Sequence, residues 1–461
     1  MPIVLLLVLV MVIAFAIYAW WDWFMSLCGL ILLMAVIDHE QMPKNFADIQ
    51  GLSPWNALLF LVFVAWLAAR RREGLTWDMP PGMMWPLIAF VLLIIVSYAR
   101  AAMDVRSFPA EFPINTLGLM SEYLINPLKY MLPALMLYDG CRTRPRMAMA
   151  LTCVLMVGVG YSLLVIKYVP LATLADERGP MWSKRLVRDA GMHANDMAVM
   201  LGGFFWALLA SVCAWERRIV RLMAGAAAAP AFLAMVLCHS RAGYVAIGVM
   251  GIVFGLVRWR WLLVVLPVLA IVVCLVFPSI PVRLAMGFGE VDAAGGDTEN
   301  WDEVTSGRTT GLWPPVIEQV SHSPLVGYGT LAIWRTETYA KITAGEGFCP
   351  NHPHNAYLEV LLNAGVVGLI IVLVPYGGLL VFSTRLGRDT RDPLLNAVGG
   401  AALASIGALL VGGLSGQSLF PGVPTLAMSC FSGIVARAWV DSRRACAQRH
   451  PSPRRAKEGI A

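Results

Sequence analysis

A short polar segment, Asn351-His-Pro-His-Asn-Ala-Tyr-Leu-Glu359, runs directly into a long apolar block of the sequence. If this block is a helix, His354 lies at its start, where an apolar span meets water. An imidazole at such a surface can accept a proton near neutral pH, so His354 is a candidate general base. We expect its polar neighbours Asn355, Tyr357 and Glu359 to support it.

The same segment could instead hold a metal ion through His352 and His354. Zinc sites draw on further ligands at characteristic spacings, and the sequence contains neither H-E-x-x-H nor C-x-x-C. It also lacks the G-x-S-x-G turn of serine hydrolases and the phosphate-binding loop G-x-x-x-x-G-K-[S/T]. We therefore expect no metal and no cofactor.

Basic residues beside apolar blocks are the second chemical feature of the chain. Arg241 lies between two apolar blocks with almost no loop between them, and Arg308 lies in an acidic stretch. Lys184 and Arg188 share a face if their segment is helical. The guanidinium donates two parallel hydrogen bonds and stays protonated, which suits a phosphate. We expect Arg241, Arg308 and Arg188 to bind an anionic lipid-linked group such as a diphosphate, with Lys184 in support.

Each of these basic residues also has a purely structural interpretation. Arg241 could extend to the membrane surface, and residues 184–188 could form an interfacial helix on anionic lipid. Arg308 could pair with the nearby Asp302 or Glu303. The residue types alone do not choose between the two interpretations.

Membrane-spanning helices must position these groups, because the composition is that of a membrane protein. Hydrophobic residues make up 58% of the 461 positions and charged residues 14%, whereas a soluble domain carries about 25% charged residues. Several apolar runs reach the roughly 18 residues that indicate a membrane span. This pattern excludes a soluble enzyme, a disordered chain and a nucleic-acid-binding domain, and it predicts contact with membrane lipids.

The apolar blocks predict an all-α polytopic integral membrane protein with about 12 transmembrane helices, or about 13, depending on the first 38 residues. The blocks are 3–18, 22–38, 54–69, 84–99, 122–138, 147–168, 195–214, 220–238, 243–257, 261–277, 355–382, 395–415 and 421–439. They divide the chain into N-terminal transmembrane helices (1–277), one large loop carrying the motifs (278–353), C-terminal transmembrane helices (354–440) and a basic tail (441–461).

The side of the membrane on which each connection lies follows from its basic residues, which concentrate in cytoplasmic loops. The C-terminal tail and five connections fall on one side if the spans alternate; the connections begin at Arg70, Arg142, Arg217, Arg258 and Arg385. We place that side in the cytoplasm. Loop 278–353 then lies outside, and its four basic and nine acidic residues give it a charge of −5. The N-terminus lies outside if the first 38 residues cross twice, and in the cytoplasm if they cross once.

Histidines concentrate on the outer side in this topology. They are His193, His239, His322, His352 and His354. Several titratable imidazoles on one face suggest a working surface there. We expect His239 to support the site.

Several short motifs occur in a fixed order along the chain. The pattern H-[N/S/Q], nine residues, G-x-x-[G/T/Y] is present as His354-Asn355, residues 356–364 and Gly365-Val-Val-Gly368. The other pieces are His193-Ala-Asn195-Asp196, Ser240-Arg241-Ala-Gly243, Gly307-Arg308 followed by Trp313, and Pro324-Leu-Val-Gly-Tyr-Gly329. In these motifs the chain resembles the O-antigen ligase and polymerase superfamily of bacterial envelope glycosyltransferases. The resemblance covers roughly residues 190–440, and the N-terminal third matches only as a series of spans.

The resemblance implies transfer of O-antigen polysaccharide from undecaprenyl diphosphate to a sugar of lipid A–core, at the periplasmic face of the bacterial inner membrane. It implies an inverting enzyme that needs neither metal nor ATP, with a GT-C-like helical fold, and it adds Asn195 to the supporting residues. The residues suit this chemistry, because a diphosphate is already an activated leaving group. Arginines would offset its charge while His354 deprotonates the attacking hydroxyl.

Three other functions would draw on similar features. An O-antigen polymerase would extend the glycan itself, and a protein O-glycosylation ligase would use a Ser or Thr acceptor with the same donor. A transporter of the lipid-linked glycan would more often place paired ionisable residues in mid-membrane. Here the unusual charges are predicted at one surface, which favours an enzyme.

Overall fold

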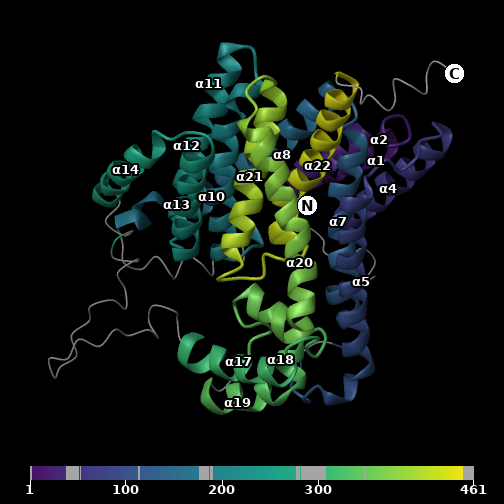
Figure 1. The fold of residues 1–461 in the computed structure, drawn as a ribbon, viewed down its shortest axis with the longest axis vertical. Coiled ribbons are helices and arrows are strands. Elements are labelled where there is room, and N and C mark those ends of the chain that lie inside the picture. Colours follow the sequence, from purple (N-terminus) through teal and green to yellow (C-terminus); the bar gives the residue numbers. More distant parts are fainter. Residues whose placement is uncertain are drawn as a thin grey trace.

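The computed structural model describes residues 3–37, 51, 53–112, 115–175, 186, 190–276, 281, 308–346 and 349–449, and every regular element in these ranges is a helix (Figure 1). Seven helices are long and apolar enough to cross a membrane, which confirms an all-helical polytopic membrane protein. They are α5 (Pro81–Met103), α8 (Arg144–Tyr168), α10 with η4 (Ala194–Ala214), α11 with α12 (Arg218–Leu237), α20 (Ala356–Arg388), α21 (Pro393–Gly412) and α22 (Val423–Arg449).

Shorter helices account for most of the remaining apolar blocks. Four apolar ones are α1 (Ile3–Tyr18), α2 (Trp23–Leu32), α13 (Arg241–Val257) and α14 (Leu262–Val276). The others are α3 (Met34–Ile37), α4 (Pro54–Arg72), η1 (Val105–Ser107), α6 (Thr116–Met120), η2 (Ser121–Ile125), α7 (Asn126–Gly140), η3 (Leu171–Ala175), η5 (Arg308–Leu312), α17 (Trp313–His322), α18 (Ala332–Arg335) and α19 (Glu337–Glu346). A new helix starts after Asp22, because its carboxylate caps α2 by accepting from the amides of Phe24 (3.0 Å) and Met25 (3.2 Å).

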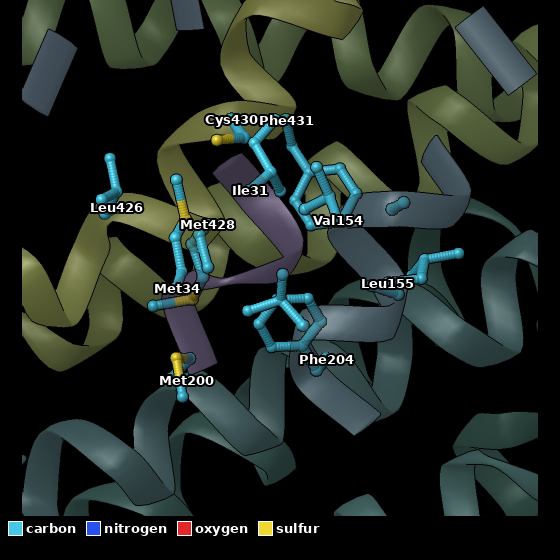
Figure 2. Packing of buried hydrophobic residues seen from close by; sticks show 14 of the residues in the cluster. Ile31, Met34, Val154, Leu155, Met200, Phe204, Leu426, Met428, Cys430 and Phe431 are labelled. Carbon is cyan, nitrogen blue, oxygen red and sulfur yellow. The ribbon is translucent and has the colours of Figure 1, made fainter. Parts of the chain in front are cut away.

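The largest core lies where α2, α3, α8, α10 and α22 meet (Figure 2). Phe204 of α10 and Phe431 of α22 pack there with their ring centroids 6.0 Å apart. Gly158 of α8 lies directly against the Phe204 ring, where any side chain would overlap it. Aromatic rings on two helices and a glycine on the third therefore fix how closely α8, α10 and α22 approach.

Helix α21 lies within the bundle and packs against α10, α20 and α22. Its sequence is rich in Gly and Ala, which lets neighbouring backbones come close. A Cβ on Gly399 would overlap the backbone of Gly387 in α20, and one on Gly203 of α10 would lie 3.1 Å from the Ala408 Cβ. Small residues thus replace the long side chains that would otherwise hold these helices apart.

One end of the bundle, here called the arginine end, holds a network of buried ion pairs. Asp139 at the end of α7 pairs with Arg70 of α4 and with Arg142 (2.5 Å). Asp78, between α4 and α5, accepts from Arg437 of α22 at 2.8 Å. Arginines from distant parts of the sequence thus meet at one end of their helices, and their charges are offset by carboxylates within the protein.

The opposite end carries a small helical subdomain of η5, α17, α18 and α19, which Figure 1 shows at the lower end of the molecule. Residues 104–125, between α5 and α7, complete it: the Phe112 ring lies 5.3 Å from that of Trp334, and Asp104 pairs with Arg335 at 2.9 Å. The sequence predicted loop 278–353 as the one large loop on this side, and most of that loop before Arg308 lies outside the described residues. The subdomain therefore draws on two segments more than 200 residues apart.

Candidate functional site

His354 lies at the tip of a tightly held turn that leads into α20. Its φ of 52° is left-handed, a backbone conformation that non-glycine residues seldom adopt outside constrained sites. The peptide group between Pro353 and His354 is held at both ends: Nε1 of Trp313 donates to its carbonyl oxygen (2.9 Å), and its N–H donates to Nδ1 of His352 (3.1 Å). The two imidazole rings lie with their centroids 4.3 Å apart.

The residues that follow His354 anchor α20. The Asn355 side chain caps the helix by accepting from the amides of Tyr357 (3.0 Å) and Leu358 (3.2 Å). The Tyr357 hydroxyl donates to the Leu410 carbonyl of α21 at 2.6 Å. Glu359, half-buried one turn further along, accepts from the Gln417 amide at 3.0 Å. Asn355 and Tyr357 thus anchor the start of the helix that directly follows His354.

The first glycine of the histidine motif, Gly365, breaks α20. Gly365 has φ 64° and ψ −166°, and a Cβ there would overlap the backbone of Leu325. The loop 324–329 passes through this break, and a Cβ on Gly327 would in turn lie 2.5 Å from the amide nitrogen of Ala364. Backbone hydrogen bonds join the two segments: Val366 to Pro324 (2.8 Å), Val367 to Leu325 (3.1 Å), Tyr328 to Leu362 (3.0 Å) and Gly329 to Asn363 (2.6 Å). The two glycine motifs therefore form one interlocked joint.

Two arginines that the sequence analysis did not select hold this joint. Arg100, at the end of α5, donates to the carbonyls of Val326 and Gly327, both at 2.6 Å. Arg335 donates to the Tyr328 carbonyl at 2.7 Å and also pairs with Asp104. A sequence signal did exist for Arg335, which is one of only four basic residues in an acidic loop.

Arg308 starts the π-helical turn η5, which leads into α17 and Trp313. Arg308 is half-buried, and this burial lowers the pKa of its guanidinium. Among the residues that the structure describes, Arg308 makes no hydrogen bond and no ion pair; Asp302 and Glu303, its predicted alternative partners, lie outside them. A half-buried guanidinium without an acidic partner is costly, so this position suits an anionic ligand.

The histidines respond to the same electrostatic surroundings. Burial, with the positive charges of Arg308 and His193 nearby, lowers the pKa of His354 to about 4. Burial, His354, Arg308 and His193 lower that of His352 to about 3. His193, Arg308, His352 and His354 therefore act on one another, and we call this region the histidine end of the bundle. Both imidazoles of the motif are neutral near pH 7, so His354 is free to accept a proton.

The Ser-Arg-x-Gly motif joins α13 to the start of α10, which His193 precedes. The Ser240 hydroxyl donates to Asn195 Oδ1 at 2.7 Å and caps α13, placing Arg241 as the first residue of that helix. Gly243 permits the contact, because a Cβ there would lie 2.5 Å from that of Ala198. Arg241 is half-buried at this junction, which the hydrogen bond between Ser240 and Asn195 holds in place.

The other predicted site residues are His239, which directly precedes Ser240, and two basic residues outside the described chain. His239 is only 6% exposed, has φ 49°, and its Nε2 lies 3.3 Å from the Thr173 hydroxyl, so it is part of the buried packing. Lys184 and Arg188 lie outside the described residues. Asp196, in the first turn of α10, interacts electrostatically with His193 and was not selected from the sequence. In the part of the chain that the structure covers, no group of three or more His, Cys, Asp or Glu residues could hold a metal ion.

The segment that builds this site can be compared with known protein families. Residues 226–373 match the family described as O-antigen ligase. This segment is therefore similar to the O-antigen ligase family. The match covers about a third of the chain and runs from the end of α11 into α20, so this O-antigen ligase segment includes Arg241, Arg308, His354 and Gly365. No curated protein matches the chain.

Proposed function

We propose that this protein transfers O-antigen polysaccharide from undecaprenyl diphosphate to a sugar of lipid A–core. The observation that carries the proposal is the histidine end itself: a neutral His354 beside the half-buried, positively charged Arg308, in a segment that matches the O-antigen ligase family. A neutral imidazole can take a proton, and a half-buried guanidinium can hold a diphosphate. Transfer from a lipid diphosphate to a hydroxyl needs both.

The proposed reaction is a direct displacement. A ring nitrogen of His354 takes the proton of the acceptor hydroxyl while the hydroxyl oxygen attacks the anomeric carbon of the glycan. The bond from that carbon to the diphosphate oxygen breaks, and its electron pair leaves with undecaprenyl diphosphate. Arg308 and Arg241 offset the charge that develops on this leaving group. The configuration at the anomeric carbon is inverted, and the activated donor makes a metal, a cofactor or ATP unnecessary.

The proposal includes an orientation in the membrane. We place the arginine end in the cytoplasm and the histidine end in the periplasm of a bacterial inner membrane, because basic residues concentrate on the cytoplasmic side. The chain then has about 12 crossings and a GT-C-like architecture, with the four segments 1–277, 278–353, 354–440 and 441–461 as its divisions.

Cysteine labelling in intact cells tests this orientation with residues that the structure exposes. Cys446, near the end of α22, is an exposed natural thiol, and Ser321 of α17 is exposed at the opposite end. A membrane-impermeant maleimide should label a Ser321→Cys variant in a Cys446→Ser background from the periplasm. It should label Cys446 only after the inner membrane is opened. Labelling of both sites from the same side would contradict the orientation.

Reconstitution tests the activity. The purified protein in lipid nanodiscs receives an undecaprenyl diphosphate glycan together with lipid A–core, a free glycan repeat or a Ser/Thr peptide as acceptor. Transfer to lipid A–core supports the ligase, elongation of the glycan indicates a polymerase, and transfer to the peptide indicates a protein O-glycosylation ligase. Movement of the lipid-linked glycan across the bilayer without transfer would identify a transporter and contradict the proposal.

A further inference from the structure

The peptide group before His354 is held in one orientation by two side chains, Trp313 and His352. The peptide group between Pro353 and His354 is bound from both sides, by Trp313 Nε1 at its oxygen and by His352 Nδ1 at its N–H. A flip of this peptide plane would turn both groups away from their partners. It would also change the φ of His354, now 52°, since the N–H orientation and this angle are coupled. The two side chains therefore hold His354 in its left-handed conformation.

The hydrogen bond also fixes the protonation of His352. A backbone N–H can only donate, so Nδ1 of His352 must carry a lone pair and any ring proton must sit on Nε2. A doubly protonated His352 would point an N–H at the N–H of His354, and the contact would be lost.

The groups around His352 all oppose a second proton. His354 lies beside it on the same turn, Arg308 faces it from η5, and His193 faces it from the start of α10; with burial, these lower its pKa to about 3. No carboxylate stabilises a charged His352 in the part of the chain that the structure describes. His352 thus stays an acceptor through the whole range in which His354 would work as a base.

We propose that His352 is a positioning residue for His354: its neutral imidazole holds the peptide group before His354 through Nδ1 and so fixes where the catalytic ring points. This inference rests on the proposed function of His354. It assigns the two histidines different roles. His354 takes a proton from the acceptor hydroxyl, whereas His352 must stay neutral, with its only ring proton on Nε2.

Substitutions that keep or move the acceptor atom test the proposal. The Oδ1 of asparagine occupies nearly the place of histidine Nδ1, whereas the glutamine amide reaches nearer the place of Nε2. Loss of one such hydrogen bond is commonly worth about three- to tenfold. We therefore expect His352→Ala and His352→Gln to lower kcat by about three- to tenfold, with the KM for the donor unchanged, and His352→Asn to recover most of that loss.

A structural measurement supports the kinetic one and does not depend on turnover. A cryo-EM structure of the His352→Ala variant should show the peptide before His354 rotated, whereas the His352→Asn variant should keep it in place. Thermal unfolding of all variants in detergent controls for folding. If the His352→Ala variant does not fold, the comparison of His352→Asn with His352→Gln still tests the proposal.

The outcomes separate this inference from the function on which it rests. Full kcat in His352→Ala, or rescue by Gln instead of Asn, would overturn the role of Nδ1 while leaving His354 as base. Activity of His354→Ala would instead overturn the general base and leave the peptide orientation to be judged from the structures.

Discussion

The two ends of the bundle treat charge in opposite ways. At the arginine end, Asp78 and Asp139 neutralise the arginines that meet there, and each carboxylate takes hydrogen bonds from more than one of them. At the histidine end, Arg308 is half-buried without an acidic partner in the described chain, and burial together with its charge lowers the pKa of both histidines of the motif. A charge that the protein pairs stabilises the fold, whereas a half-buried charge left unpaired is available to a ligand.

Among the substitutions at the two ends, removing the proposed base should have the largest effect on turnover. We expect His354→Ala and His354→Gln to lower turnover by about 10²–10⁴, because neither side chain can accept the proton. Binding of the lipid-linked donor should persist, since the arginines remain. Single-turnover transfer with purified protein measures the loss, and a pull-down with labelled donor provides the control. An active Gln variant would remove His354 from the role of base.

The pH dependence of the wild-type enzyme tests whether His354 acts as a base, because a base and a cationic contact predict opposite changes in rate with pH. A base works when it is unprotonated, so kcat/KM should be constant near neutrality and fall as pH drops through about 4, the pKa to which burial and the nearby cations lower His354. Bound diphosphate brings negative charge to the site and raises this pKa, so the acid limb of kcat should lie at higher pH than that of kcat/KM. A rate that rises as the pH falls would indicate a cationic contact instead.

Matched arginine substitutions at the two ends test the contrast directly. Arg308→Ala should lower turnover by about tenfold to a hundredfold, the value of a charged hydrogen bond, without lowering thermal stability. Arg241→Ala should act in the same direction, and Lys should rescue either variant only in part, because it lacks the planar fork. Both are read as kcat/KM for the donor in the reconstituted assay.

Arg70→Ala is the control at the arginine end. It leaves the buried Asp139 with fewer partners, so the unfolding temperature should fall while turnover per folded molecule stays within about twofold. If Arg70→Ala kept its unfolding temperature but lost turnover, the idea that the arginine end serves stability and the histidine end serves activity would be contradicted.

The interlocked glycines predict a smaller effect that depends on position within one helix. Gly365→Ala forces a side chain into a left-handed residue and against the Leu325 backbone, so stability and turnover should both fall. Gly377, further along α20, has open space around it, and Gly377→Ala should be neutral or slightly stabilising. Thermal unfolding of the two variants in detergent makes the comparison, and equal effects would contradict the joint.

The smallest effect is expected from Asp78. Burial alone would raise its pKa, but hydrogen bonds from Arg444 and Arg437 outweigh this and lower it to about 2. A lowered pKa contributes stability that is present above the unfolded value of about 4 and is lost as the pH falls toward 2. Asp78→Asn should therefore unfold at a lower temperature than wild type at pH 7, and the difference should disappear near pH 2. A difference that persists there would have another cause.

The sequence by itself determined the class of the protein, and it predicts the chemical groups of the candidate site. Long apolar blocks dictate membrane helices, because a span needs about 20 apolar residues and its backbone must be satisfied internally. The spacing of the histidine and glycine motifs predicts His354 and Gly365 as site residues and indicates the resemblance to the O-antigen ligase family. These signals are local in the chain, so they can be read from one sequence.

Only the tertiary structure decided what most of these residues do. Asn355 is a helix cap, Tyr357 a tether to α21, and His239 part of the packing, although all three were expected beside the base for their chemistry. Arg100 and Trp313 reach partners 226 and 40 residues away, and such pairings leave no period or motif in the sequence. The sequence supplies the polar side chains, but the hydrogen-bond partner of each one depends on which helices pack together in the fold.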